Sequence, residues 1–307
     1  MISIIIPVFN TRHEWLNECL DSIAVQTFPD WEAIIVDDAS DSPILLSDFP
    51  CTIDNPRFRL IRHESNKGPA AARNTAVSCS YGELLFTMDS DDTLVPDSLE
   101  IFFAQMKSYP HIDCVYSQFQ TFGSASVLWD NPVLKNSDMI LKQWVPGPGV
   151  LMKRALFDKI GGYPQDEIFR CGNEDWDFWL GAASLNFIVE RIPRALYNYR
   201  ISQKSLSNTS TKRWHYKTIE RMYERHKSFI DAYSMADRFL YNGYYSSVRR
   251  CSREELARVM HLGYFHAPSM KDKARLYMIF TKRIVANIID RMRRTTFIIS
   301  KKGEMAE

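Results

Sequence analysis

The sequence contains few cysteines, and none of them are paired at metal-ligand spacing. Six cysteines are scattered over 307 residues, and no two of them stand in a C-x-x-C arrangement. Without that spacing, neither a zinc site nor a thiol–disulfide redox motif is indicated. Scattered cysteines are typical of free thiols in a reducing compartment, so we expect a cytoplasmic protein without disulfides.

Long apolar runs are also absent from the sequence. No uncharged apolar stretch reaches roughly 18 residues, the length that a membrane-spanning helix needs. The chain begins MISIIIPVFN, which has no basic leader and an apolar run too short for a secretory signal. We therefore expect neither a transmembrane helix nor a signal peptide.

Neither sign of charge dominates the chain as a whole. Lys and Arg number 38 and Asp and Glu number 37, so the charge balance gives no case for nucleic-acid binding. Residues 271–307 differ from the rest, with ten basic and four acidic residues. Apolar residues recur near helical spacing within 271–302, which suits a basic amphipathic helix on an anionic membrane surface. The alternative is a terminal helix docked on the protein with a solvated basic face.

Short apolar runs alternate with segments of helical spacing through the first part of the chain. Strands that alternate with helices pair in parallel, which predicts an α/β fold with a mostly parallel, Rossmann-like sheet flanked by helices. The predicted strands are Ile2–Val8, Glu32–Val36, Phe58–Arg62, Leu84–Met88 and Cys114–Ser117. The predicted helices span residues 15–23, 69–80, 96–107, 153–160 and 173–184.

The pattern changes along the chain. Residues 121–150 form a turn-rich stretch, and from about residue 212 onward the sequence is all-helical. We predict two domains, a catalytic one over residues 1–210 and a helical extension over residues 211–307.

Polar residues follow each of the first four predicted strands. The carboxyl ends of parallel strands lie along one edge of a sheet, where ligands bind, so we expect these side chains to converge on one cleft. They are Pro7, Phe9 and Asn10 after the first strand, Asp37 and Asp38 after the second, Asn66, Lys67, Gly68 and Arg73 after the third, and Asp89, Asp91 and Asp92 after the fourth.

Acidic side chains together with a basic side chain suit the binding of a nucleoside diphosphate and its metal ion. A hard divalent cation prefers carboxylate oxygen and often shares its coordination with substrate phosphates, which indicates Asp89 and Asp91. Asp37 or Asp38 is placed to accept hydrogen bonds from a nucleobase or ribose. Arg73 is placed to fork onto a phosphate or to steady the acids. The alternative is that these residues are ordinary helix caps and turn residues, but placement at successive strand ends would then be a coincidence.

The motifs SIIIPVFN, SIAVQTF, IIVDDAS, NKGPAAARN and MDSDDTLVPDSL resemble the successive motifs of family 2 glycosyltransferases, which are inverting enzymes of the GT-A fold. The resemblance extends over roughly residues 1 to 210. It implies a nucleotide-sugar donor, a UDP-sugar being favoured, bound with Mg²⁺ or Mn²⁺. By motif matching, Asp38 lies near the base with Pro7 beside it, Asp89 near the ribose or metal, and Asp91 is the main metal ligand. Asp92 stays open as the alternative ligand.

The stretch CGNEDWDFWL resembles the family's Glu-Asp motif. An inverting displacement needs a base that removes the proton of the acceptor hydroxyl, and the matching position is Asp175. Glu174 would orient the acceptor or support the loop. The alternative is structural: Asn173 caps a helix whose first turn favours acids.

The stretch YRISQKSLS departs from the family pattern, because Ser202 stands where many relatives have a histidine that reaches the metal or diphosphate. Arg200 or Lys204 is then expected to contact the diphosphate.

These features together predict an inverting, metal-dependent hexosyltransferase that acts on a hydroxyl of a glycan or lipid-linked acceptor, in surface polysaccharide synthesis of the bacterial type. One alternative is a sugar nucleotidyltransferase, which usually has a glycine-rich basic loop after its first strand, whereas PVFNTRHEW has no glycine. A receiver-like signalling domain would place its paired acids after the first strand. A catalytically silent relative is the third alternative, although Asp91 and Asp175 are retained.

Overall fold

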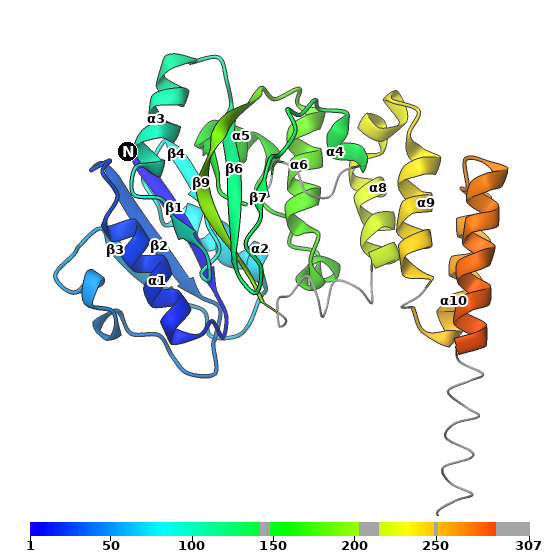
Figure 1. The fold of residues 1–307 in the computed structure, drawn as a ribbon, viewed down its shortest axis with the longest axis horizontal. Coiled ribbons are helices and arrows are strands. Elements are labelled where there is room, and N and C mark those ends of the chain that lie inside the picture. The colour runs from blue at the N-terminus through cyan, green and yellow to red at the C-terminus, as the bar shows by residue number, and fades with distance from the viewer. Residues whose placement is uncertain (142–145, 147, 203–214, 249–250, 287–307) are drawn as a thin grey trace, which may run out of the picture. The chain divides into compact units, whose positions relative to one another are not determined.

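A mixed sheet forms the centre of the first part of the chain in the computed structural model (Figure 1). The structure describes residues 1–141, 146, 148–202, 215–248 and 251–286. The chain divides into two compact units, residues 1–211 and residues 212–307. The assignment of catalysis to the first unit alone stays a prediction.

The strands follow the order β3-β2-β1-β4-β8-β6-β9-β5, with β7 paired to β6. All five predicted strands are present, and the predicted α/β fold is confirmed. The structure adds β5, β7, β8 and β9, which were not predicted, and β8 runs antiparallel between β4 and β6. The bounds are β1 Ile2–Val8, β2 Trp31–Asp37, β3 Phe58–Arg62, β4 Leu84–Thr87, β5 Thr93–Leu94, β6 Cys114–Gly123, β7 Leu128–Trp129, β8 Val150–Lys153 and β9 Val189–Ile201.

The central strand β1 shows why this sequence forms a sheet covered on both faces. Its run of isoleucines is completely buried, on the odd as well as the even positions, as expected for a parallel strand covered on both sides. Ile4 and Ile6 share a core with α1 and α3, while α2 packs against β1 and β2. The helices of this unit are α1 His13–Ala24, α2 Pro69–Ser78, α3 Ser98–Ser108, α4 Asp138–Leu141, α5 Arg154–Ile160 and α6 Glu174–Ser184.

The structural alternative for the start of α6 had Asn173 capping the helix with its side chain. In the structure Asn173 precedes α6 with a left-handed backbone (φ 69°), and its side chain makes no capping hydrogen bond. The short amide side chain tolerates this conformation, so Asn173 turns the chain from a preceding 3-10 helix, η3 (Glu167–Cys171), into α6.

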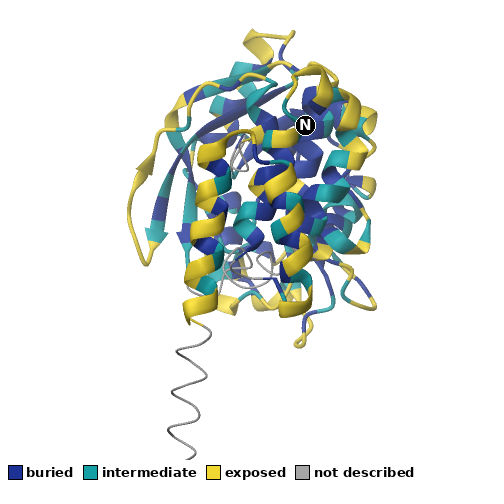
Figure 2. Ribbon diagram, turned by 90° about the vertical axis from the view of Figure 1, so that its right-hand side faces the viewer, coloured by how far each residue is buried: buried dark blue, intermediate teal, exposed yellow. Residues whose placement is uncertain are grey.

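The second unit is helical, as predicted. It contains α8 (His215–Ala232), α9 (Ala236–Ser247), α10 (Arg253–Phe265) and a further helix described over residues 270–286. The α10 helix begins with a reciprocal capping box between Ser252 and Glu255. In Figure 2 the helix that leads into the grey trace is exposed along much of its outer side. Among the described residues, no helix combines the length and apolarity needed to cross a membrane.

Candidate functional site

The loops that follow the parallel strands are tied to one another at one edge of the sheet. The hydroxyl groups of Thr11 and Ser90 lie 2.7 Å apart, which joins the loop after β1 to the acidic turn after β4. At the end of β1, Pro7 is half-buried, and Phe9 and Asn10 are exposed. The predicted donor residues of this strand therefore stand beside the acidic turn.

Asp37 stabilises the loop after β2 through hydrogen bonds. Its buried carboxylate accepts a hydrogen bond from the Ser40 backbone N–H at 2.9 Å and pairs with Arg62. The Ser40 hydroxyl in turn accepts from the Asn10 N–H at 2.9 Å. Burial opposes ionisation, but the hydrogen bonds from Ser40 and Arg62 outweigh it and lower the pKa of Asp37. Asp37 thereby links the loops after β1 and β2.

Asp38 anchors the loop that precedes α2. Its side chain is 3% exposed, and its carboxylate accepts from the N–H groups of Lys67 at 2.9 Å and Gly68 at 2.7 Å. A ring nitrogen of His63 lies 2.6 Å from the same carboxylate. Gly68 has φ +91°, and a Cβ there would lie 3.3 Å from the side chain of Arg170, so glycine suits this position. The Lys67 side chain is exposed at the edge.

Arg73 joins two acids that lie far apart in the sequence. One guanidinium nitrogen donates to Glu174 at 2.8 Å and the other donates to Asp89 at 3.0 Å. Its side chain is 12% exposed and lies over the ring of Tyr163, 5.3 Å from the centroid. Burial opposes its charge, but the two carboxylates raise the pKa of Arg73 above its ordinary value. In the structure Arg73 bridges these two acids, and its contact with a phosphate stays a prediction.

The three acids after β4 have different surroundings. Asp92 is completely buried and accepts hydrogen bonds from the Tyr197 hydroxyl and the Arg200 N–H, both at 2.7 Å. It therefore fastens the turn to β9. The Asp89 side chain is 45% exposed, and Asp91 is partly buried. Burial, with the nearby Asp89 carboxylate, raises the pKa of Asp91 to about 6.

A carboxylate whose pKa is raised by a like charge nearby is in a setting that a cation would stabilise. No cluster of three or more His, Cys, Asp or Glu side chains suited to a metal forms within the described part of the chain. Asp89 and Asp91 still fit Mg²⁺ or Mn²⁺, because Mg²⁺ commonly takes one or two carboxylates and completes its shell with phosphate oxygens and water.

Arg200 approaches the acidic turn from its main-chain side. Its guanidinium donates to the Asp91 carbonyl oxygen at 2.7 Å and to Glu18 at 2.5 Å. The group lies between the rings of Trp15 and Phe122, at 5.0 and 4.2 Å from their centroids. In this arrangement Arg200 positions the turn, and its contact with a diphosphate stays a prediction. Lys204, the other residue considered for that role, lies outside the described residues.

Asp175 stands in the first turn of α6. Its side chain is exposed, and one of its oxygens accepts from the Trp176 N–H at 2.7 Å. Desolvation by the surrounding protein, with the like charge of Glu174, raises the pKa of Asp175 to about 7. A carboxylate with this pKa suits a general base near neutral pH. The aromatic residues Trp176, Phe178 and Trp179 that follow are buried core residues.

Among the residues that were not predicted, two hold Asp92 and Arg200 in place. Tyr197 lies 105 residues from its partner Asp92, and Glu18 lies 182 residues from its partner Arg200. No local pattern marks either of them, because their importance arises only from contacts between β9, α1 and the acidic turn.

Comparisons with known proteins agree on one family. Residues 3–166 match the family model described as glycosyl transferase family 2. An uncharacterised glycosyltransferase of Haemophilus influenzae is 28% identical over 257 residues, which cover 76% of this chain and 84% of that relative.

An Escherichia coli relative, the UDP-Glc:alpha-D-GlcNAc-diphosphoundecaprenol beta-1,3-glucosyltransferase WfgD, is 23% identical over 239 residues, covering 75% of this chain and 87% of that protein. The structure of Staphylococcus aureus TarS with UDP-GlcNAc superposes with a TM-score of 0.68 at 18% identity, covering 92% of this chain and 88% of that one. This structural likeness shows the GT-A fold.

Proposed function

Because the chain belongs to glycosyl transferase family 2, we propose that it transfers a sugar from a nucleotide-sugar donor to a hydroxyl group with inversion at the anomeric carbon. A UDP-sugar is the proposed donor, which the UDP-GlcNAc bound to TarS and the UDP-Glc named for WfgD support. The resemblance seen in the sequence motifs is confirmed by the family model.

The Arg73 bridge is the observation that carries this proposal. Asp89 belongs to the acidic turn after β4, and Glu174 neighbours the base candidate Asp175 in α6. Through Arg73 these two acids share one cation, with donor–acceptor distances of 3.0 and 2.8 Å. The proposed donor site and the proposed base are therefore neighbours, as a single direct displacement requires.

In the proposed reaction Asp175 accepts the proton of the acceptor hydroxyl as the oxygen attacks the anomeric carbon. Asp89 and Asp91 would hold Mg²⁺ or Mn²⁺, which when bound neutralises charge that grows on the leaving diphosphate. Asp38 fixes the Lys67–Gly68 loop beside the donor, and Glu174 and Arg73 set the charge around the base. Asp92 and Arg200 keep the acidic turn in place.

We propose a glycan or lipid-linked acceptor in bacterial surface polysaccharide synthesis. The relative WfgD, whose name specifies a diphosphoundecaprenol-linked acceptor, supports this choice. A catalytically silent relative is the alternative, and the experiment below separates the two.

We further propose that this is a cytoplasmic protein and that residues 271–302 hold it at the inner face of a membrane. The described part of this segment, up to residue 286, exposes Tyr277, Met278 and Val285 at 57%, 54% and 49% among basic residues. Residues 287–302 lie outside the described residues. In liposome co-sedimentation, the full chain should bind vesicles rich in anionic lipid, and Lys271→Glu/Lys282→Glu should bind less. Equal binding by the two proteins would contradict membrane contact here.

The test of the proposed activity is a thermal-shift panel of nucleoside diphosphates with and without Mn²⁺, on the wild type and on Asp91→Ala. A ligand raises the midpoint according to its concentration relative to its dissociation constant. We expect UDP to raise the midpoint more with Mn²⁺, and Asp91→Ala to lose that extra rise. Transfer assays then follow product formation and anomeric configuration, with Asp175→Asn inactive. Nucleotide binding without transfer to any acceptor or to water would favour the silent relative.

A further inference from the structure

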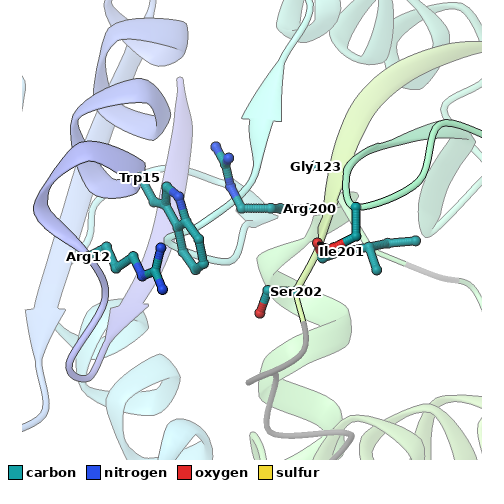
Figure 3. A pocket seen from close by; sticks show the side chains of 7 residues that line it. Arg12, Trp15, Gly123, Arg200, Ile201 and Ser202 are labelled. Atoms are coloured by element: carbon teal, nitrogen blue, oxygen red, sulfur yellow. Dashed lines mark hydrogen bonds between the residues drawn. The ribbon is translucent and has the colours of Figure 1, made fainter.

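A cavity of about 450 Å³ opens beside the acidic turn (Figure 3). Its size is within the range typical of small-molecule sites. It lies between the beginning of α1 and the ends of β6 and β9. We call this cavity the Arg12–Trp15 pocket. The residues that line it are Arg12, Trp15, Gly123, Ser124, Arg200, Ile201 and Ser202.

The pocket carries positive charge without an acid among its lining residues. Both guanidinium groups lie on the same indole, Arg12 at 4.5 Å and Arg200 at 5.0 Å from the Trp15 centroid. Arg200 is neutralised by Glu18, at 2.5 Å. Within the described part of the chain Arg12 forms no ion pair, and its side chain is exposed. The pocket therefore presents one uncompensated guanidinium, held in place by an aromatic ring.

The pocket borders the proposed donor site and shares Arg200 and Ser202 with the predicted diphosphate contacts. Asp38, Gly68 and Arg73 do not line it. Arg200 meets the acidic turn through the Asp91 carbonyl oxygen at 2.7 Å, and not through the carboxylate that would face the metal. An anion in this pocket would thus lie close to the reaction centre, on the main-chain side of the acidic turn.

We propose that the Arg12–Trp15 pocket binds a phosphate or diphosphate group carried by the acceptor substrate. This inference rests on the proposed function and specifies its acceptor class. A guanidinium forks onto phosphate oxygens with matched geometry, and the hydroxyl-bearing residues Ser124 and Ser202 lie on the same wall. The Trp15 ring gives the neighbouring carbon atoms of the acceptor an apolar surface.

Fluorine NMR of protein labelled with 5-fluorotryptophan tests this directly, because the chain has seven tryptophans and Trp15→Phe identifies the Trp15 signal. The probes are inorganic pyrophosphate, glucose 1-phosphate and farnesyl diphosphate, titrated without divalent metal. We expect the Trp15 signal to shift saturably, and Arg12→Gln to weaken the binding by at least about tenfold, the loss of one charge-assisted contact. The tighter of the two organic probes identifies a lipid diphosphate or a sugar phosphate as the source.

Arg57→Gln is the matched control, because Arg57 stacks on Trp31 at 3.9 Å and lies outside this pocket. It should bind the probes like the wild type. A Trp15 signal that no probe moves, or that responds equally in Arg12→Gln, overturns the proposal. If UDP with Mn²⁺ drives the Trp15 signal to the position reached with pyrophosphate, the pocket belongs to the donor and the proposal is wrong. The thermal-shift panel with UDP reports on the proposed function independently.

Discussion

The acid pair at the start of α6 predicts how transfer depends on pH. Asp175 must be deprotonated to act as the base, and its pKa is raised to about 7 by desolvation and by the neighbouring Glu174 carboxylate. Activity should therefore fall tenfold per pH unit below about pH 7. Glu174→Gln removes the like charge and leaves Arg73 beside the base. The pKa of Asp175 should fall, and the acidic limb of the profile should move to lower pH.

The size of this shift follows from Coulomb's law. For an assumed separation of roughly 6 Å and an effective dielectric constant of about 20, two unit charges interact by about 3 kcal/mol. The Asp175 side chain is exposed and Arg73 already offsets part of the Glu174 charge, so the net effect is smaller. We expect a shift of about one pH unit, which corresponds to about 1.4 kcal/mol.

The assay is kcat/KM for sugar transfer between pH 5 and 9, at saturating metal, because this ratio reports ionisations of the free enzyme. The position of the limb is independent of any loss in maximal rate that Glu174→Gln causes. Glu167→Gln is the control, since Glu167 is an exposed acid in η3 that is not part of the acid pair. A limb that stays in place in Glu174→Gln, or moves to higher pH, would refute the coupling between the two acids.

Three further outcomes follow from the same geometry. Arg73→Gln leaves Asp89 and Glu174 without their shared cation, so the acidic limb should move to higher pH, opposite to Glu174→Gln, and kcat/KM should fall by at least about a hundredfold in the same assay. Asp92→Ala leaves the O–H donor of buried Tyr197 and the Arg200 N–H without their acceptor, at a cost of about 2–3 kcal/mol; calorimetry should show the midpoint lowered by roughly 5–10 °C, and an unchanged midpoint would contradict the role given to Asp92. Gly149→Ala would place its Cβ 2.2 Å from the Tyr197 ring, whereas the Cβ of Gly161→Ala, also at positive φ, meets nothing within 4 Å. Urea unfolding should show that the free energy of unfolding falls by more than about 3 kcal/mol in Gly149→Ala and by about 1 kcal/mol in Gly161→Ala. Equal losses would contradict the packing at Tyr197.

The parallel half of the fold could be predicted because its signals are local. The apolar run of β1 and the spacing of Leu16, Leu20 and Ile23 in α1 report burial through neighbours a few residues away. The later strands lack such signals. β8 is four residues long and β9 mixes polar with apolar positions, so their place in the sheet depends on pairing with β4 and β6.

The motifs and their order also indicated the family from sequence, through their resemblance to those of family 2 glycosyltransferases. The strand-end positions of the acid clusters predicted that they meet at one edge of the sheet. The sequence by itself determined which residue types stand at that edge. It did not determine what each carboxylate does, because Asp91 and Asp92 are adjacent and chemically identical. Only the tertiary structure separates them, since Tyr197 and the Arg200 backbone bury and bind Asp92 alone. The same holds for Arg73, whose partners Asp89 and Glu174 folding brings together from distant parts of the chain. For Asp175 the adjacent Glu174 is visible in the sequence, but the burial that raises its pKa arises only in the folded protein.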